Sequence, residues 1–191
     1  MLQNYHSQGW LPLLPRRLSG RGGRGLRMHL REDRNMMPPT VQHEAWMDLA
    51  LAEARGALAT QDVPIGAVVI GPDGTVIGTG RNEREASGDP TAHAEVVAIR
   101  QAAAKVGEWR LEGCTLVVTL EPCAMCAGAI VLARIPRVVF GAWDEKAGAA
   151  GSVFDILRER RLNHWVEVFP EVREDECAKL LTDFFGSRRS G

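Results

Sequence analysis

Three potential metal ligands at a fixed spacing constrain this chain more than any other feature of its sequence. Cys123 and Cys126 stand three residues apart directly after Pro122, and His93 lies thirty positions before the first cysteine. Proline suits the first turn of a helix, where residues three apart share one face. His, Cys and Cys form a common ligand set for zinc. The fold must therefore bring two distant segments together around one metal ion.

Both segments are predicted to hold their ligands at the start of a helix. The apolar run 124–133 predicts a helix that continues from Pro122, and Thr91 is expected to cap a second helix through His93 and Glu95. A helix N-terminus favours anions, because its free N–H groups and its dipole carry partial positive charge. The pKa of a thiol falls there, which prepares both sulfurs to hold a cation. The buried stripe of the second helix is expected to comprise Val96, Val97, Ile99 and Ala103.

This ligand set indicates a catalytic zinc site. Three protein ligands leave the fourth tetrahedral position to water, whereas structural sites are closed by four. Zinc lowers the pKa of such a water from ~15.7 to roughly 7. Glu95 is two residues from His93, so it can reach the water without binding the metal, and we expect it to move the protons. The alternative is a structural histidine beside half of a zinc knuckle, but the sequence has no second Cys/His pair at a suitable spacing.

Composition is that of an ordinary globular domain. Hydrophobic residues make up 45% and charged residues 25% of 191 positions, which is enough to bury one sizeable core. No apolar run reaches 18 residues, so a membrane span is not expected. Four cysteines with one close pair favour a metal site in a reducing compartment over disulfides. We therefore expect a cytoplasmic protein, with Cys114 and Cys177 as buried small hydrophobes.

Residues 1–37 are predicted to be a disordered tail, and residues 38–189 one zinc-dependent catalytic domain. The tail is rich in Arg and Gly and carries a net charge of +5, which leaves −6 for the rest. Such a segment buries too little apolar surface to order itself. Three roles are open: an extension without function upstream of a start at Met28, Met36 or Met37, sequence-independent affinity for RNA, or a targeting peptide.

The remaining pattern predicts an α/β fold, a three-layer α/β/α sandwich on a mixed sheet of about five strands. Strands are expected at 65–70, 75–79, 116–120, 137–141 and 166–169, the first two joined by a turn at 71–74. Besides the two ligand helices, helices are expected at 41–59 with Thr40 as cap, at 153–160 and at 173–185, and a polar loop at 80–90. Strand, helix and strand around the cysteines suggest a parallel βαβ unit, with the chemistry where strands end and helices begin.

The two ligand segments, H-x-E and P-C-x-x-C, together form the known signature of zinc-dependent nucleobase deaminases. The surrounding residues narrow the choice. Residues 89–95, 121–130, 138–144 with Lys146, and 148–152 closely resemble the family of bacterial tRNA-specific adenosine deaminases, whose fold is cytidine deaminase-like. The likeness continues through 162–164 to 183–185 and covers roughly residues 41–189.

The resemblance implies a homodimer, with one zinc ion per subunit, that converts the wobble adenosine (position 34) in the anticodon loop of an arginine tRNA to inosine. His93, Cys123 and Cys126 would hold the zinc. Glu95 would take a proton from zinc-bound water and pass it to N1 of adenine while hydroxide attacks C6, and would later protonate the departing ammonia. Asn82 would hydrogen-bond the target base. Pro64 and Ile65 would help form the pocket wall. Asp144 and Asn163 would contact neighbouring nucleotides of the anticodon loop.

Two departures from that family concern RNA binding. Gly186 stands where the family often has a basic residue after Phe184 and Phe185, so a terminal RNA contact would have to come from Arg188 or Arg189. A charge of −6 outside the tail is unusual for an RNA-binding protein. A local basic patch is one answer, and a solvated helix face is the other interpretation of its candidates, Arg158, Arg160 and Arg161.

Two other functions are open. The substrate could be a free purine such as guanine, in which case no RNA would be needed. The chain could also be a non-catalytic, zinc-stabilised RNA-binding partner subunit, although an intact Glu95 speaks against a retired site. Trp143 and Trp165 are expected to be packing residues and not platforms on which bases stack.

Overall fold

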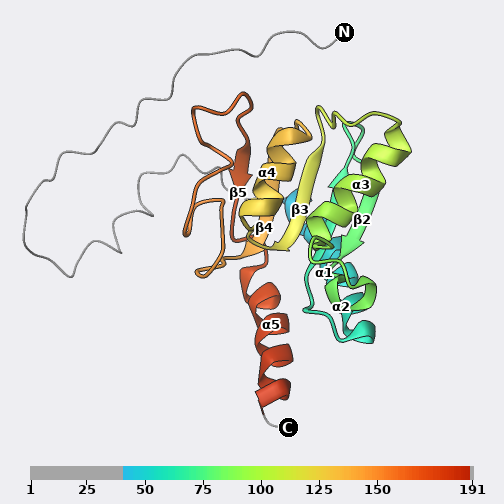
Figure 1. The fold of residues 1–191 in the computed structure, drawn as a ribbon, viewed down its shortest axis with the longest axis vertical. Coiled ribbons are helices and arrows are strands. Elements are labelled where there is room, and N and C mark those ends of the chain that lie inside the picture. The colour runs from blue at the N-terminus through green and yellow to red at the C-terminus, as the bar shows by residue number, and fades with distance from the viewer. Residues whose placement is uncertain (1–40, 190–191) are drawn as a thin grey trace, which may run out of the picture. The chain divides into compact units, whose positions relative to one another are not determined.

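One mixed sheet of five strands organises the computed structural model, which describes residues 41–189 (Figure 1). The order across the sheet is β2-β1-β3-β4-β5. Strand β1 pairs antiparallel with β2 and β3, whereas β3–β4 and β4–β5 are parallel. The strands are β1 (Gly66–Ile70), β2 (Val76–Arg81), β3 (Thr115–Leu120), β4 (Arg137–Ala142) and β5 (Glu167–Phe169). The predicted mixed sheet, hairpin and parallel βαβ unit are confirmed.

Helices cover both faces of this sheet. They are α1 (Val41–Gly56), α2 (Arg84–Ser87), α3 (Ala94–Val106), α4 (Ala124–Leu132) and α5 (Glu174–Arg189), and the short 3-10 helix η1 (Ala57–Thr60) follows α1. Side chains of α3 and α4 belong to one core cluster, and those of α1 and α5 to the other. The predicted three-layer α/β/α sandwich is therefore confirmed.

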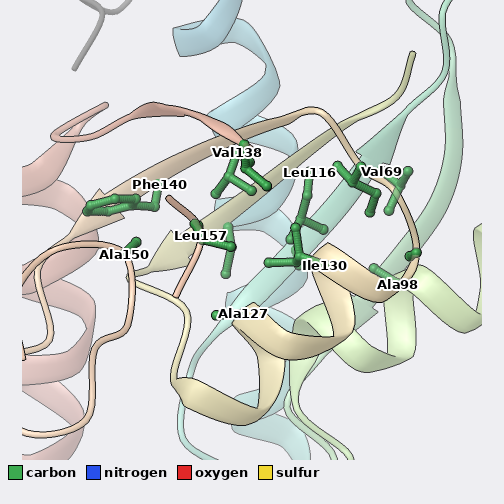
Figure 2. Packing of buried hydrophobic residues seen from close by; sticks show 14 of the residues in the cluster. Val69, Ala98, Leu116, Ala127, Ile130, Val138, Phe140, Ala150 and Leu157 are labelled. Carbon is green, nitrogen blue, oxygen red and sulfur yellow. The ribbon is translucent and has the colours of Figure 1, made fainter. Parts of the chain in front are cut away.

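Strand β1 shows how the sequence builds two cores at once. Ala67 and Val69 pack in the cluster of α3 and α4, while Val68 and Ile70 pack in the cluster of α1 and α5. Successive side chains of a strand point to opposite faces, so a strand covered on both sides is apolar at every position. Figure 2 shows the first cluster, in which Val69 of β1 lies among side chains of β3, β4, α3 and α4.

Helix α3 lies close against β2 because two glycines of that strand have no side chain. A Cβ atom on Gly80 would collide with the backbone of Ala94 and Ala98, and one on Gly78 with the backbone of Ala98 and Ala102. The face of α3 toward the sheet is accordingly small. Of the predicted stripe, Val96 is buried and Ile99 packs partly buried against the core, whereas the other buried residues of α3 are Ala94, Glu95, Ala98 and Ala102.

The helix predicted at 153–160 is wrong, because this segment belongs to a loop that folds back on itself. Ala150 and Asp155 form an isolated β-bridge, and the Ile156 N–H donates to the Ala149 carbonyl at 2.9 Å. The Arg158 guanidinium donates to Asp155 and to the Ala150 carbonyl, and only 9% of its side chain is exposed. Arg158 thus stabilises the loop from inside and is not part of a basic surface patch.

Several smaller expectations can be compared with the structure. Cys114 and Cys177 are free and buried, as predicted. Trp143 packs edge-on against Phe140, while half of the Trp165 side chain is exposed. Among residues 41–189, no helix combines the length and apolarity that a membrane crossing requires. The predicted tail at 1–37, the domain start at residue 38 and the Thr40 cap lie outside the described residues.

Candidate active site

The three predicted metal ligands converge at the first turns of α3 and α4. His93 Nδ1 lies 3.6 Å from Cys123 Sγ and 3.6 Å from Cys126 Sγ. With Zn–S near 2.3 Å and Zn–N near 2.0 Å at tetrahedral angles, the nitrogen and sulfur ligands of a zinc ion stand about 3.5 Å apart. All three ligand atoms lie within 4.8 Å of one another. These residues therefore fit a tetrahedral zinc ion.

Two of the three ligands occupy capping positions, and the third, Cys126, lies in the first turn of α4. His93 and Cys123 are the residues directly before α3 and α4, and both have extended backbones. Thr91 is not the predicted cap, because its hydroxyl and its N–H both donate to Asp89 Oδ1 at 2.7 Å. Asp89 thereby closes a turn just before His93. The extended cap residue turns the chain into the helix and leaves the imidazole directed at the sulfurs.

The thiol pair is tuned for a cation. Hydrogen bonds with Cys126 first, and then with His93, lower the pKa of Cys123 to about 3. The hydrogen bond to Cys123 raises the pKa of Cys126, and burial adds to that rise. The hydrogen bond to Cys123 also raises the pKa of His93. One thiolate therefore forms readily, and zinc binding must displace the proton that the second sulfur holds.

Glu95 lies in the first turn of α3 with only 4% of its surface exposed. Burial, and to a smaller extent the charge of Cys123, raises the pKa of its carboxyl to about 7. A group of this pKa is well matched to giving and taking protons near neutral pH. Its environment is therefore that of a proton carrier.

A cavity of about 140 Å³ opens beside the ligands. Its volume lies below the roughly 300–1,000 Å³ of pockets that enclose whole drug-sized ligands. The cavity therefore suits a single planar base, with the rest of the nucleotide outside. The lining residues are Val63, Ile65, Asn82, Arg84, His93, Ala94, Glu95, Leu120, Glu121, Cys123, Asp144 and Ala147.

Asn82 is poised in this cavity. The residue is 5% exposed, and its side-chain amide has no hydrogen-bond partner within residues 41–189. Its backbone N–H donates to the Ile65 carbonyl at 2.9 Å, which joins the end of β2 to the start of β1. A side-chain amide offers an NH₂ group as donor and a carbonyl oxygen as acceptor. Both a donor and an acceptor are thus available to a bound base.

One wall of the cavity is held by Asp62, a residue that sequence reasoning missed. Asp62 is fully buried, and its carboxylate accepts the N–H groups of Glu85 at 2.7 Å and Ala86 at 3.1 Å and the Thr60 hydroxyl at 2.8 Å. Burial acts to raise its pKa, but these hydrogen bonds outweigh that effect and lower it. The carboxylate thus caps α2, a helix inside the segment that was predicted to be a loop.

The other wall is held by Glu121, which sequence reasoning also left without a role. Glu121 is 2% exposed, and its carboxylate accepts N–H groups from Asp144 at 3.1 Å, Ala150 at 2.9 Å and Ser152 at 3.0 Å. Gly148 faces the same carboxylate so closely that a Cβ there would collide with it. The signal in the sequence was a lone acid at the end of the apolar strand β3.

The predicted substrate-contacting residues are not all in one place. Ile65, Asn82 and Asp144 line the cavity, whereas Pro64 is buried beside it without lining it. Asn163 is exposed, and its side-chain oxygen accepts from Arg134 beyond the C-terminal end of α4. Because the cavity adjoins the N-terminal end of that helix, Asn163 lies away from the metal ligands of its own chain.

Comparisons with known proteins agree with the geometry. A family model described as the cytidine and deoxycytidylate deaminase zinc-binding region matches residues 40–142. The chain is 47% identical over 149 residues to the tRNA-specific adenosine deaminase of Bacillus subtilis, covering 78% of this chain and 92% of the relative.

Two solved structures separate sequence from fold. One, from work on A-to-I editing by tRNA:A34 deaminases at the wobble position of transfer RNA, is 44% identical. It has a TM-score of 0.69 and covers 72% of this chain and 99% of its own. A guanine deaminase from Nitrosomonas europaea has a TM-score of 0.66 over 86% of this chain and 94% of its own, but is 22% identical. The second likeness shows the fold alone.

Proposed function

Since this chain belongs to the tRNA-specific adenosine deaminases, a zinc-dependent family within the cytidine and deoxycytidylate deaminase superfamily, we propose that it converts adenosine 34 of an arginine tRNA to inosine. One observation carries the proposal. A His/Cys/Cys cluster and a buried glutamate of raised pKa lie at a cavity sized for one base. Since a base stacked in a duplex cannot enter such a cavity, an anticodon loop is a suitable substrate, because its bases splay outward at low cost.

His93, Cys123 and Cys126 would hold one zinc ion per subunit. A bound zinc ion supplies a water whose pKa is lowered toward neutrality, and thus a hydroxide nucleophile for C6 of adenine. Glu95 would accept the proton that the attacking water loses, since its pKa of about 7 lets it accept and release protons at physiological pH. It would deliver this proton to N1 of the ring and would then carry a second proton from the hydroxyl group added at C6 to the amino group, which leaves as ammonia.

The base would be held by the cavity residues. Asn82 hydrogen-bonds the ring through its unpaired side-chain amide. Ile65 supplies an apolar surface against the base, and the buried Pro64 supports that surface from behind. Asp144 contacts a neighbouring anticodon-loop nucleotide at the rim, and Asn163 contacts nucleotides farther from the target.

We also expect a homodimer, and exposed apolar side chains support it. Met125 and Leu132 are 39% and 71% exposed on α4, and Val153 and Phe154 are 46% and 57% exposed in the following loop. That loop runs beside α4, since it is bridged to Cys123 at one end and bonded through Asn163 to Arg134 at the other. Exposed apolar side chains on neighbouring segments are typical of an interface. The tRNA substrate would place the enzyme in the cytoplasm.

The test is a comparison of substrates. Zinc-loaded protein is incubated with an arginine-tRNA anticodon stem-loop bearing adenosine at the wobble position, and separately with free guanine. Inosine in the RNA supports the proposal, and ammonia from guanine contradicts it. If neither product forms while the RNA is bound, the chain is a non-catalytic partner subunit. A Glu95→Ala protein should keep its zinc and make no inosine, and inosine formation near the parent rate would remove the shuttle role.

A further inference from the structure

Arg84 is the first residue of α2 and lines the mouth of the cavity. No other lysine or arginine is among the described residues that line it, whereas Glu95, Glu121 and Asp144 all do. Glu95 and Glu121 are buried, so Asp144 is the carboxyl group that a polyanionic substrate meets first at this opening. Like charges in a cleft disfavour such an approach unless a cation offsets them.

The guanidinium of Arg84 is uncommitted. Within residues 41–189 it has no ion pair and no hydrogen bond, and its charge acts only through space on Asp62 and His93. The acid before it in the chain is already engaged, since Glu83 pairs with Arg81 at 3.6 Å. By contrast, Arg158, Arg161 and Arg173 are all tied to carboxylates.

The backbone that carries this side chain is firmly anchored. The buried Asp62 carboxylate accepts the N–H groups of the two residues after Arg84. The Glu83 N–H donates to the Ala92 carbonyl at 2.9 Å, which joins α2 to the turn before His93. The position of the Arg84 backbone is thus fixed relative to the metal ligands, while its side chain is exposed to solvent.

We propose that Arg84 binds the backbone phosphate next to the target nucleotide, and so forms a phosphate subsite at the mouth of the pocket. This inference rests on the proposed function, because it requires an RNA substrate. The cavity of about 140 Å³ admits the base and leaves the ribose and phosphates outside, at the place where Arg84 stands. A guanidinium presents paired N–H donors that match two phosphate oxygens. Such a contact contributes affinity and register but no base specificity.

The experiment measures inosine formation in anticodon stem-loops by the parent and by Arg84→Ala, Arg84→Lys and Arg55→Ala proteins. Arg55 is a matched control, since it is exposed, has no ion pair within the described residues and does not line the cavity. Arg84→Ala should raise KM by about tenfold, with kcat changed by less than about twofold. The slope of log KM against log salt should fall by about 0.7, the amount for one phosphate contact to single-stranded nucleic acid. Arg84→Lys should keep most of that slope.

A second set of stem-loops carries a single uncharged methylphosphonate linkage on the 5′ or the 3′ side of the target adenosine. For the parent, KM should rise about tenfold when one of these linkages is uncharged. For the Arg84→Ala protein, the same linkage should not raise KM further. The subsite is refuted if Arg84→Ala and Arg55→Ala have the same KM and salt slope. It is also refuted if the effects of Arg84→Ala and of the uncharged linkage on KM multiply at both linkages. If the parent makes no inosine even in the unmodified stem-loop, the proposed function fails and the phosphate subsite fails with it.

Discussion

The metal ligands of this site stand where regular elements begin, whereas the walls of the cavity are loops and one short helix. His93 and Cys123 immediately precede α3 and α4, and these helices are held by the sheet core. The walls, at residues 82–90 and 144–152, depend on two buried carboxylates from elsewhere in the chain. Regular elements thus position the chemistry, and single side chains shape the space around it.

The two carboxylates hold their walls in the same way. Asp62 and Glu121 each accept at least two backbone N–H groups and have no direct ion pair within residues 41–189. Hydrogen bonds to a charged group contribute about 1.5–3 kcal/mol each, more than neutral ones, and satisfy N–H groups that a loop leaves unpaired. Changes to the metal centre should therefore abolish turnover, and changes to the walls should alter affinity and stability while zinc stays bound.

The largest effect is expected from His93→Ala. This change removes the only nitrogen ligand and leaves two sulfurs, too few for a stable site. We expect zinc content to fall to a small fraction of one equivalent and inosine formation to be abolished. Elemental analysis and the stem-loop assay measure both. Full zinc occupancy with parent activity would mean that the imidazole is not a ligand.

Glu95→Gln should be next. The amide keeps the shape of the carboxyl but cannot carry protons, so kcat should fall by about 10²–10⁴-fold. Zinc content should equal that of the parent, because Glu95 is outside the candidate ligand cluster of His93, Cys123 and Cys126. Loss of zinc together with activity would instead mean that Glu95 helps to hold the metal.

Glu121→Gln tests the wall at residues 144–152. Its single amide oxygen cannot serve the three N–H groups that the carboxylate accepts, and its NH₂ group would face another donor. We expect a loss of about 2 kcal/mol in the free energy of unfolding and a Tm lower by about 4–8 °C. KM should rise with zinc retained, and Gly148→Ala should act similarly by crowding the carboxylate. Unchanged Tm and KM would show that the three hydrogen bonds do not hold this wall.

The smallest effect is expected from Asp62→Asn, and it should depend on pH. The folded pKa of Asp62 lies below its ordinary value of 3.8, so the carboxylate contributes stability above that pH and loses it as the pH falls through the folded pKa. At pH 7 the variant should be less stable by about 1 kcal/mol, the usual effect of losing a helix cap. Urea unfolding of both proteins at pH 7 and pH 3 measures the difference, which should shrink at the lower pH. A constant difference would mean that charge is not involved.

The contrast also explains what the sequence could predict. The metal ligands followed from spacing, since a proline after an apolar strand starts a helix and two nearby cysteines then share its first turn. The cap of α2 could not be predicted, because Asp62 is more than twenty residues away from the N–H groups that it accepts. Local patterns do not record such distant partners.

The segment 153–160 failed for the opposite reason. Its apolar residues are spaced as in a helix, but its backbone groups are satisfied by the loop itself and by Arg158, whose guanidinium reaches the Ala150 carbonyl at 2.9 Å. Which backbone partners a short segment chooses is decided by tertiary contacts, and hydrophobic spacing alone does not reveal them.

Gly78 and Gly80 affect the metal site although neither residue is a ligand or lines the cavity. Because β2 offers only hydrogen atoms to α3, the helix that begins after His93 rests directly on the strand backbone. His93 directly precedes α3, so we expect this packing to help position its imidazole. A methyl group added at Gly78 or Gly80, in the edge strand β2, would push α3 away from the sheet. We expect that shift to move the His93 nitrogen away from the two sulfurs.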